Sequence, residues 1–123
     1  MFAPIGEMPQ GAIGVEAHGW ITNDDRRILE PRIDSLIARG CRVRLLYSTG
    51  DDFAGYAEGG LLDEAVFGTR HFTAFDRIAF VGEEGPHKRA VEALRGLMPA
   101  QLRLFRRPEL DAARSWLGEG GGC

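Results

Sequence analysis

The regular alternation of strand-like and helix-like segments is the feature that most constrains the fold of this chain. Short apolar runs typical of β-strands occur at 12–21, 41–48, 77–82 and 101–106. Apolar residues at helical spacing follow these runs at 22–39, 61–72, 87–98 and 108–117. Helices between successive strands impose parallel pairing with right-handed crossovers. With segment 2–8 as an antiparallel N-terminal edge strand, the sequence predicts an α/β sheet, mostly parallel, in the order ββαβαβαβα.

The first helical segment carries a clear start signal and one contradictory residue. Thr22 is a good N-cap, and Asp24 and Asp25 place negative charge at the positive end of the helix dipole. Pro31 lies inside the apolar pattern, where proline removes a backbone donor. The sequence therefore predicts either a kink at Pro31 or a helix whose true first turn is there, preceded by a looser segment.

Length and charge limit the classes of protein to which the chain can belong. Its 123 residues suit one domain, predicted over 1–118, followed by a flexible glycine-rich tail at 119–123. A net charge of −3 argues against nucleic-acid binding. The N-terminus has no signal-peptide pattern, and no apolar run reaches the ~20 residues of a membrane span, so a cytoplasmic location is expected. Cys41 and Cys123 have no metal-ligand spacing, and no disulfide is expected between Cys41 and a cysteine that ends such a tail.

Several motifs together resemble the SpoIIAA-like family, which has a STAS-like α/β fold. The motifs are "IGVEAHGWIT" with "EP" in the first helix, "VRLLYSTGDDFAGY", "FGTRHFTAFDRIAFVG" and "LRLFRRPELDAARSWL", and they span nearly the whole chain. The resemblance implies a five-stranded STAS-like sheet and a kinship in shape to CRAL-TRIO lipid-binding domains. It implies apolar-ligand binding or peripheral membrane association as roles, without establishing a reaction.

The loop after the second parallel strand offers hydroxyls and carboxylates where ligands of open α/β sheets bind. Ser48 and Thr49 are candidate phosphoacceptors, because anti-sigma-factor antagonists carry a phosphorylated serine after this strand. Here the hydroxyls come earlier in the loop, and Asp51 and Asp52 would repel a phosphate. The two aspartates are interpreted as caps of the next helix rather than as metal ligands, and no metal is predicted.

The sequence predicts no catalytic residue, no cofactor and no enzyme activity. His18, His71 and His87 fall on a strand and on two different helices, without a nucleophile in an obvious common neighbourhood. The segment "GEEGPHKR" at 82–89 follows a strand and opens a helix, but it lacks the Gly-Lys-Ser/Thr of a phosphate-binding loop.

An excess of apolar residues is the remaining signal. Five of the eleven aromatic residues fall between 53 and 75, more than one helix face needs. They could pack in the interior, line a groove for an apolar ligand, or form a dimer interface. We predict a cleft under a glycine-rich lid over 50–68. Its predicted ligand-binding residues are Phe53, Tyr56, Leu61, Phe67, His71, Leu94 and Met98.

These patterns predict a small binding or regulatory module. The expected partners are an apolar small molecule or lipid, a second copy of the chain, and a membrane surface contacted weakly through Phe53 and Tyr56, with Lys88 and Arg89 nearby. The alternative is a phosphorylation-controlled protein-interaction domain of the anti-sigma-factor-antagonist type, in which Ser48 or Thr49 would be modified.

Overall fold

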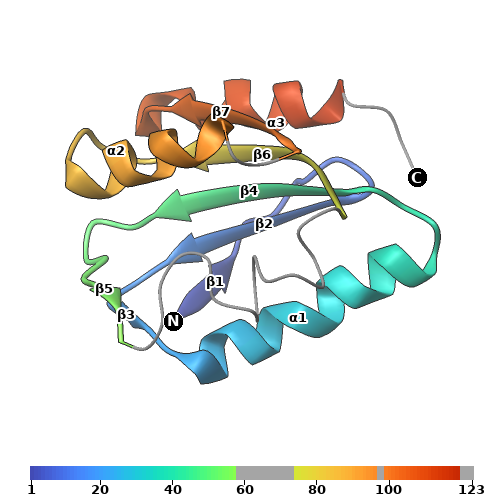
Figure 1. Ribbon diagram of the computed structural model, residues 1–123, viewed down its shortest axis with the longest axis horizontal. Helices are drawn as coiled ribbons and strands as arrows, with labels where there is room; N and C mark the ends of the chain where they lie inside the picture. The colour runs from blue at the N-terminus through green and yellow to red at the C-terminus, as the bar shows by residue number, and fades with distance from the viewer. Residues whose placement is uncertain (58–73, 97–98, 120–123) are drawn as a thin grey trace.

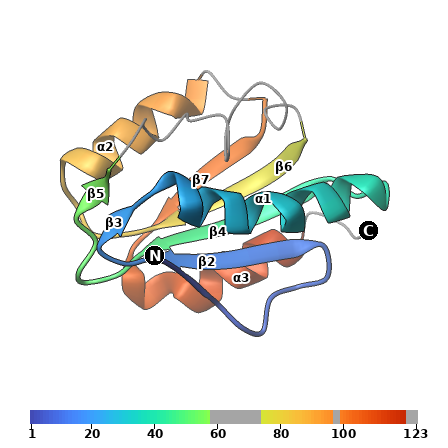
Figure 2. The same cartoon turned by 90° about the horizontal axis from the view of Figure 1, so that it is seen from below.

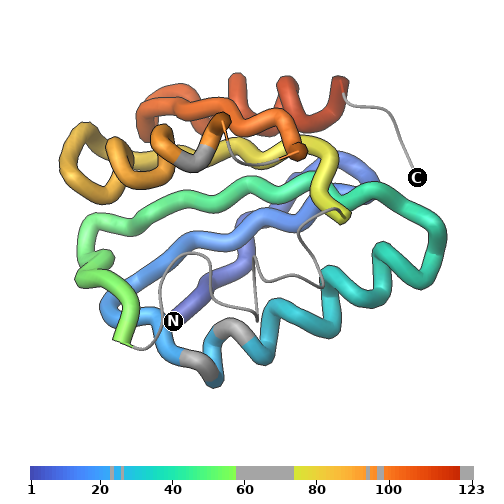
Figure 3. Tube along the Cα trace, in the orientation of Figure 1, coloured from blue at the N-terminus to red at the C-terminus, as the bar shows by residue number. Residues whose placement is uncertain are grey.

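The computed structural model describes residues 1–57, 74–96 and 99–119, and the other residues form the thin grey trace in Figure 3. Outside the described residues lie the predicted helix at 61–72 and most of the predicted lid. Four predicted ligand-binding residues also lie there, namely Leu61, Phe67, His71 and Met98. The side chain of Leu94 also lies outside them.

A five-stranded sheet forms the centre of the molecule (Figure 1). Its order is β1-β2-β4-β6-β7, and the strands are β1 (Phe2–Pro4), β2 (Ala12–Ala17), β4 (Val43–Thr49), β6 (Phe75–Val81) and β7 (Gln101–Phe105). The last four pair in parallel, and β1 pairs antiparallel with β2. The predicted α/β sheet with an antiparallel N-terminal edge is thus confirmed.

Two details of the predicted strands are wrong. The edge strand predicted at 2–8 ends at Pro4, and the strand predicted at 12–21 is broken after Ala17. Gly19 has a φ of +58°, a left-handed conformation that favours glycine, and it redirects the chain into β3 (Trp20–Ile21). β3 then pairs with β5 (Gly55–Tyr56) in a separate two-stranded sheet.

The helices cover the sheet on both faces, as Figure 2 shows. Helices α1 (Asn23–Ala38) and α2 (Pro86–Ala93) lie on one face, and α3 (Leu110–Gly118) lies on the other. Single-turn helices η1 (Leu94–Gly96) and η2 (Arg107–Glu109) follow α2 and precede α3. Aligned rows of apolar side chains face α1 and α2, one of them formed by Ile13, Leu45, Ile78 and Leu102.

Helix α1 begins where its cap predicts. The Thr22 hydroxyl accepts a hydrogen bond from the Asp25 amide at 3.3 Å, and the Asp25 carboxylate accepts one from the Thr22 amide at 2.9 Å. Burial opposes ionisation of Asp25, but the hydrogen bonds from Thr22 together with the N-terminal ammonium of Met1 hold the pKa of that carboxyl below its ordinary value. The helix continues through Pro31 to Ala38, so the predicted alternative start at Pro31 is wrong.

Replacing Thr22 with alanine is expected to lower the free energy of unfolding by about 1 kcal/mol, because the cap supplies one of the orphan amides of the first turn with an acceptor. Urea denaturation followed by circular dichroism measures the change. Thr22→Ser keeps the hydroxyl and should recover most of the lost stability. If the serine and alanine variants are equally destabilised, the hydroxyl is not responsible.

A buried arginine connects the sheet to α3. Arg44 is only 3% exposed, and its guanidinium donates to the backbone carbonyls of Leu117 and Gln10. From the next strand, Arg77 donates to the Trp116 carbonyl at 2.6 Å. Both guanidinium groups lie at the C-terminal end of α3, where unpaired carbonyls and the helix dipole favour positive charge.

Cys41 is buried and disulfide-bonded, which corrects the expectation that it would not form a disulfide.

Among the helices that the structure describes, none is long and apolar enough to span a bilayer.

Candidate functional site

The carboxyl ends of β4 and β6 place an aromatic cluster at one edge of the sheet. Phe53 and Tyr56 come from the chain after β4, Phe80 comes from β6, and His87 comes from the first turn of α2. The His87 ring lies 4.8 Å from the ring of Phe53 and 5.4 Å from that of Phe80, measured between centroids. Tyr47 stacks on Phe80 from within the sheet at 6.0 Å.

Three polar atoms form a hydrogen-bonded chain inside this cluster. The hydroxyls of Tyr47 and Tyr56 lie 2.9 Å apart, and the Tyr56 hydroxyl lies 3.2 Å from Nε2 of His87. Burial lowers the pKa of His87, since the surrounding rings solvate an imidazolium poorly. At neutral pH the imidazole is therefore uncharged and can serve as a hydrogen-bonding wall of the site.

The lowered pKa of His87 predicts a pH dependence of stability. The unfolded chain binds a proton at this residue more readily than the folded chain does, so stability is unaffected above the unfolded pKa of about 6.5 and falls as the pH drops toward the folded pKa. Replacing His87 with glutamine should flatten the curve of unfolding free energy between neutral pH and pH 5. Urea denaturation of both proteins across this range measures the difference, and parallel curves would contradict the prediction.

A pocket of about 290 Å³ opens beside the aromatic cluster. Phe53, Phe80 and His87 line one part of it, and Gly85 lies at its rim with open space around its Cα. The charged residues of its lining are Asp51, Glu83, Glu84, Lys88 and Arg107.

Both cations of this pocket are held by protein acceptors. Arg107 donates to the Thr49 carbonyl at 2.8 Å and forms an ion pair with Asp51, and its Nε lies 3.8 Å from Glu83. Lys88 is 7% exposed, and its ammonium donates to the Gly82 carbonyl at 3.2 Å and to Glu84 at 3.1 Å. The lining has three exposed carboxylates and two cations, and both cations already have protein acceptors. Its electrostatic potential therefore does not favour anions.

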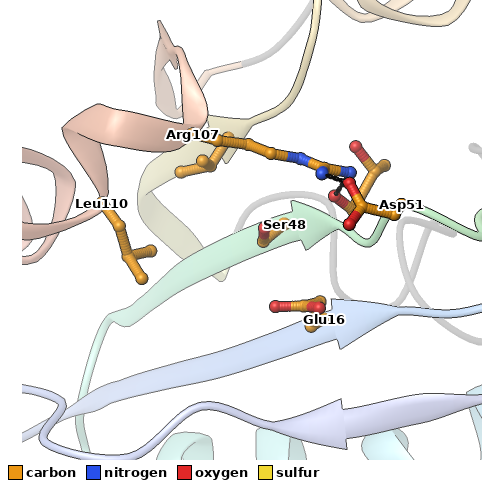
Figure 4. A pocket seen from close by; sticks show the side chains of 7 residues that line it. Glu16, Ser48, Asp51, Arg107 and Leu110 are labelled. Carbon is orange, nitrogen blue, oxygen red and sulfur yellow. Dashed lines mark hydrogen bonds and ion pairs between the residues drawn. The ribbon is translucent and has the colours of Figure 1, made fainter.

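A smaller hollow of about 160 Å³ lies on the α3 face of the same edge (Figure 4). Its lining includes Ser48, Glu16 and Leu110, and it shares Thr49, Asp51 and Arg107 with the larger pocket. Figure 4 shows Arg107 extending from η2 to Asp51, with Ser48 on β4 and Glu16 on the neighbouring strand. The candidate phosphoacceptors Ser48 and Thr49 are 5% and 8% exposed.

The two aspartates of this loop act separately. Asp51 pairs with Arg107, whereas Asp52 lies 2.7 Å from Nδ1 of His18, and Nε2 of His18 lies 3.1 Å from Glu16. The hydrogen bond with His18 lowers the pKa of Asp52. In residues 1–57, 74–96 and 99–119, no group of three metal-ligating side chains comes together.

The structure brings together two of the predicted ligand-binding residues, Phe53 and Tyr56. The other members of the cluster, His87, Phe80 and Tyr47, were not among the predicted residues. Tyr47 and Phe80 are inward-facing positions on β4 and β6 near the ends of the strands, and the alternation within each strand could have identified them as lining the site. His87 follows the proline that begins α2, a position that the topology places at the same edge.

A family model described as SpoIIAA-like matches residues 12–118. The chain belongs to the SpoIIAA-like family. Among solved structures, this SpoIIAA-like chain is similar to an uncharacterised protein with a SpoIIAA-like fold from Shewanella loihica PV-4, with a TM-score of 0.69 and 19% identity over 95% of this chain and 92% of that one. At that identity the likeness concerns the fold. A comparison with curated proteins found no match.

Proposed function

We propose that this SpoIIAA-like chain is a small binding module that takes a neutral, apolar small ligand into the pocket beside Phe53, Phe80 and His87. The observation that carries the proposal is the wall of three aromatic rings from three separate segments, next to a pocket of about 290 Å³. Aromatic side chains bury large areas at low entropic cost, and small-molecule sites combine such walls with a few polar groups.

The charges at the pocket select the kind of ligand. Arg107 and Lys88 already have carboxylate and carbonyl partners, so an anionic headgroup would have to displace them. Asp51, Glu83 and Glu84 are exposed at the rim and repel an anion or an anionic membrane surface. Neutral apolar compounds, including uncharged lipids, therefore fit the pocket better than fatty-acid anions do.

The proposal is for binding without turnover. Nε2 of His87 faces the Tyr56 hydroxyl, a poor nucleophile at neutral pH, and the second tyrosine extends this chain of hydroxyls into the core. This arrangement fixes the orientation of the imidazole. His87 would therefore contact the ligand as part of the pocket wall and would not act as a general base.

Phosphorylation of Ser48 or Thr49 is less well supported. A kinase needs its target hydroxyl extended into its own active site, whereas both side chains are buried at the end of β4. Glu16 and Asp51 line the hollow beside Ser48 and would oppose a phosphate there.

A steric block tests the proposed function. Gly85 lines the pocket, and a Cβ built on it meets no atom within 4 Å, so Gly85→Phe should fill the pocket without a clash. Gly96 in η1 also has open space, and Gly96→Phe is the matched control. The probe is N-phenyl-1-naphthylamine, a neutral fluorophore that brightens in apolar sites.

The titration should show saturable binding to the wild-type protein. Gly85→Phe is expected to weaken the probe's affinity by about tenfold or more, equivalent to about 1.4 kcal/mol, whereas Gly96→Phe should leave it unchanged. The proposal fails if the probe does not bind, or if both variants bind it as tightly as the wild-type protein does.

A further inference from the structure

A second site, independent of the aromatic pocket, lies along one flank of α1. A groove of about 380 Å³ is lined by Ile13, Pro31, Arg32, Ser35, Leu36 and Arg39. Among the described residues, its lining has two arginines and no acidic residue, in a chain whose net charge is −3. The described lining of the groove is therefore positively charged, although the chain as a whole is negative.

The two guanidinium groups are available to a ligand. Arg32 and Arg39 are exposed, and among the residues that the structure describes neither side chain has a hydrogen bond or ion pair. Arg27 on the same helix, by contrast, pairs with Asp24 at 2.8 Å. An arginine without an internal acceptor can donate both of its parallel N–H groups to one carboxylate or phosphate.

Helical spacing places the polar groups of the groove on one flank of α1. Arg32, Ser35 and Arg39 occupy positions i, i+3 and i+7, so each arginine lies within about one turn of Ser35 on the same flank. The two arginine Cα atoms are about 10 Å apart along the axis, a distance that two long side chains can span. An anionic group over Ser35 would thus meet two guanidinium groups and a hydroxyl.

The rest of the groove is apolar. Ile13 of β2, Leu36 and Pro31 line it together with the arginines. One turn before Arg32 on the same flank lies Ile28, whose side chain is 71% exposed. An apolar surface of this kind beside a cationic cluster is complementary to a molecule with an anionic head and an apolar tail.

We propose that the α1 groove, formed by the six residues named above, binds a free single-chain amphiphilic carboxylate. The carboxylate would lie over Ser35 between Arg32 and Arg39, and the apolar tail would lie on Ile13, Pro31 and Leu36. This site differs from the aromatic pocket in charge and in place. The aromatic pocket lies at the carboxyl edge of the sheet and takes neutral ligands, whereas the groove takes anions.

The test uses dodecanoate below its critical micelle concentration, titrated into the full chain and followed by amide chemical shifts in NMR. The largest shifts are expected at Ile13 and over 28–39. In the double variant Arg32→Gln/Arg39→Gln the affinity should fall by about tenfold or more. The matched control is Arg89→Gln/Arg95→Gln, which removes two exposed arginines from α2 and η1 and should bind like the wild-type protein.

Two further arms separate the alternatives. Dodecanol has the same tail without charge, and it should shift the groove resonances far less than dodecanoate does. The wild-type protein and the Arg32→Gln/Arg39→Gln variant should bind equally to vesicles that contain anionic lipid. The proposal is overturned if dodecanoate shifts the residues of the carboxyl edge instead, or if both double variants bind dodecanoate equally. It is also overturned if the two double variants differ only in their binding to vesicles, because the occupant would then be a membrane surface.

Discussion

Replacing Arg44 with methionine is expected to lower the free energy of unfolding by about 2–4 kcal/mol, because the buried Leu117 carbonyl and the part-buried Gln10 carbonyl lose their donor. Methionine preserves most of the side-chain volume, so the loss reports the hydrogen bonds to Leu117 and Gln10 more than a cavity. Those bonds connect β4 to the end of α3 and to the loop before β2. Chemical denaturation measures the change.

The effect should be local as well as large. Amide exchange over 113–118 is expected to accelerate in Arg44→Met more than exchange in α1 does, because α3 loses its polar attachment to the sheet. Arg89→Met is the control, since Arg89 is exposed on α2 and its replacement should change stability by no more than about 0.5 kcal/mol. Equal stabilities of the two variants would show that the buried guanidinium does not hold α3.

Replacing Phe80 with alanine is expected to cost about 3–5 kcal/mol of stability, because the ring is buried between Tyr47 and His87 and the site cannot collapse fully. The same variant removes part of the pocket wall. Binding of N-phenyl-1-naphthylamine should therefore weaken even under conditions in which the variant remains folded.

Phe105 provides the matched control for Phe80. Its ring is buried on the α3 face against Trp116, so Phe105→Ala should lose a similar amount of stability. It lies outside the aromatic pocket and should bind the probe like the wild-type protein. If both variants lose the probe to the same degree, the loss follows general destabilisation and not the removal of a wall.

The sheet could be predicted because its signals are local. Parallel strands buried on both faces appear as short apolar runs, and the crossover rule then fixes their direction. The cap at Thr22 is equally local and was predicted correctly. The role of Arg44 could not be predicted in this way. Its acceptor at Leu117 lies in a helix some seventy residues later, which contacts the strand only in the folded protein.

The candidate site was predictable only where its residues are close in sequence. Phe53 and Tyr56 could be grouped from their spacing, whereas their contacts with His87 depend on the start of α2. The contact of His87 with Phe80 depends in addition on the parallel register of β6. The break at Gly19 was missed because alternation continues through it, and only the pairing of β3 with β5 shows why the chain turns there.

The most direct test of the central claim is a chemical-shift map of the wild-type protein titrated with N-phenyl-1-naphthylamine. If the aromatic pocket is the binding site, the shifting amides fall at the carboxyl edge, over 49–56 and 80–88, and the resonances of the α1 groove stay unchanged. Shifts centred on α1, or scattered over the surface without saturation, would contradict the claim that the aromatic pocket is the binding site.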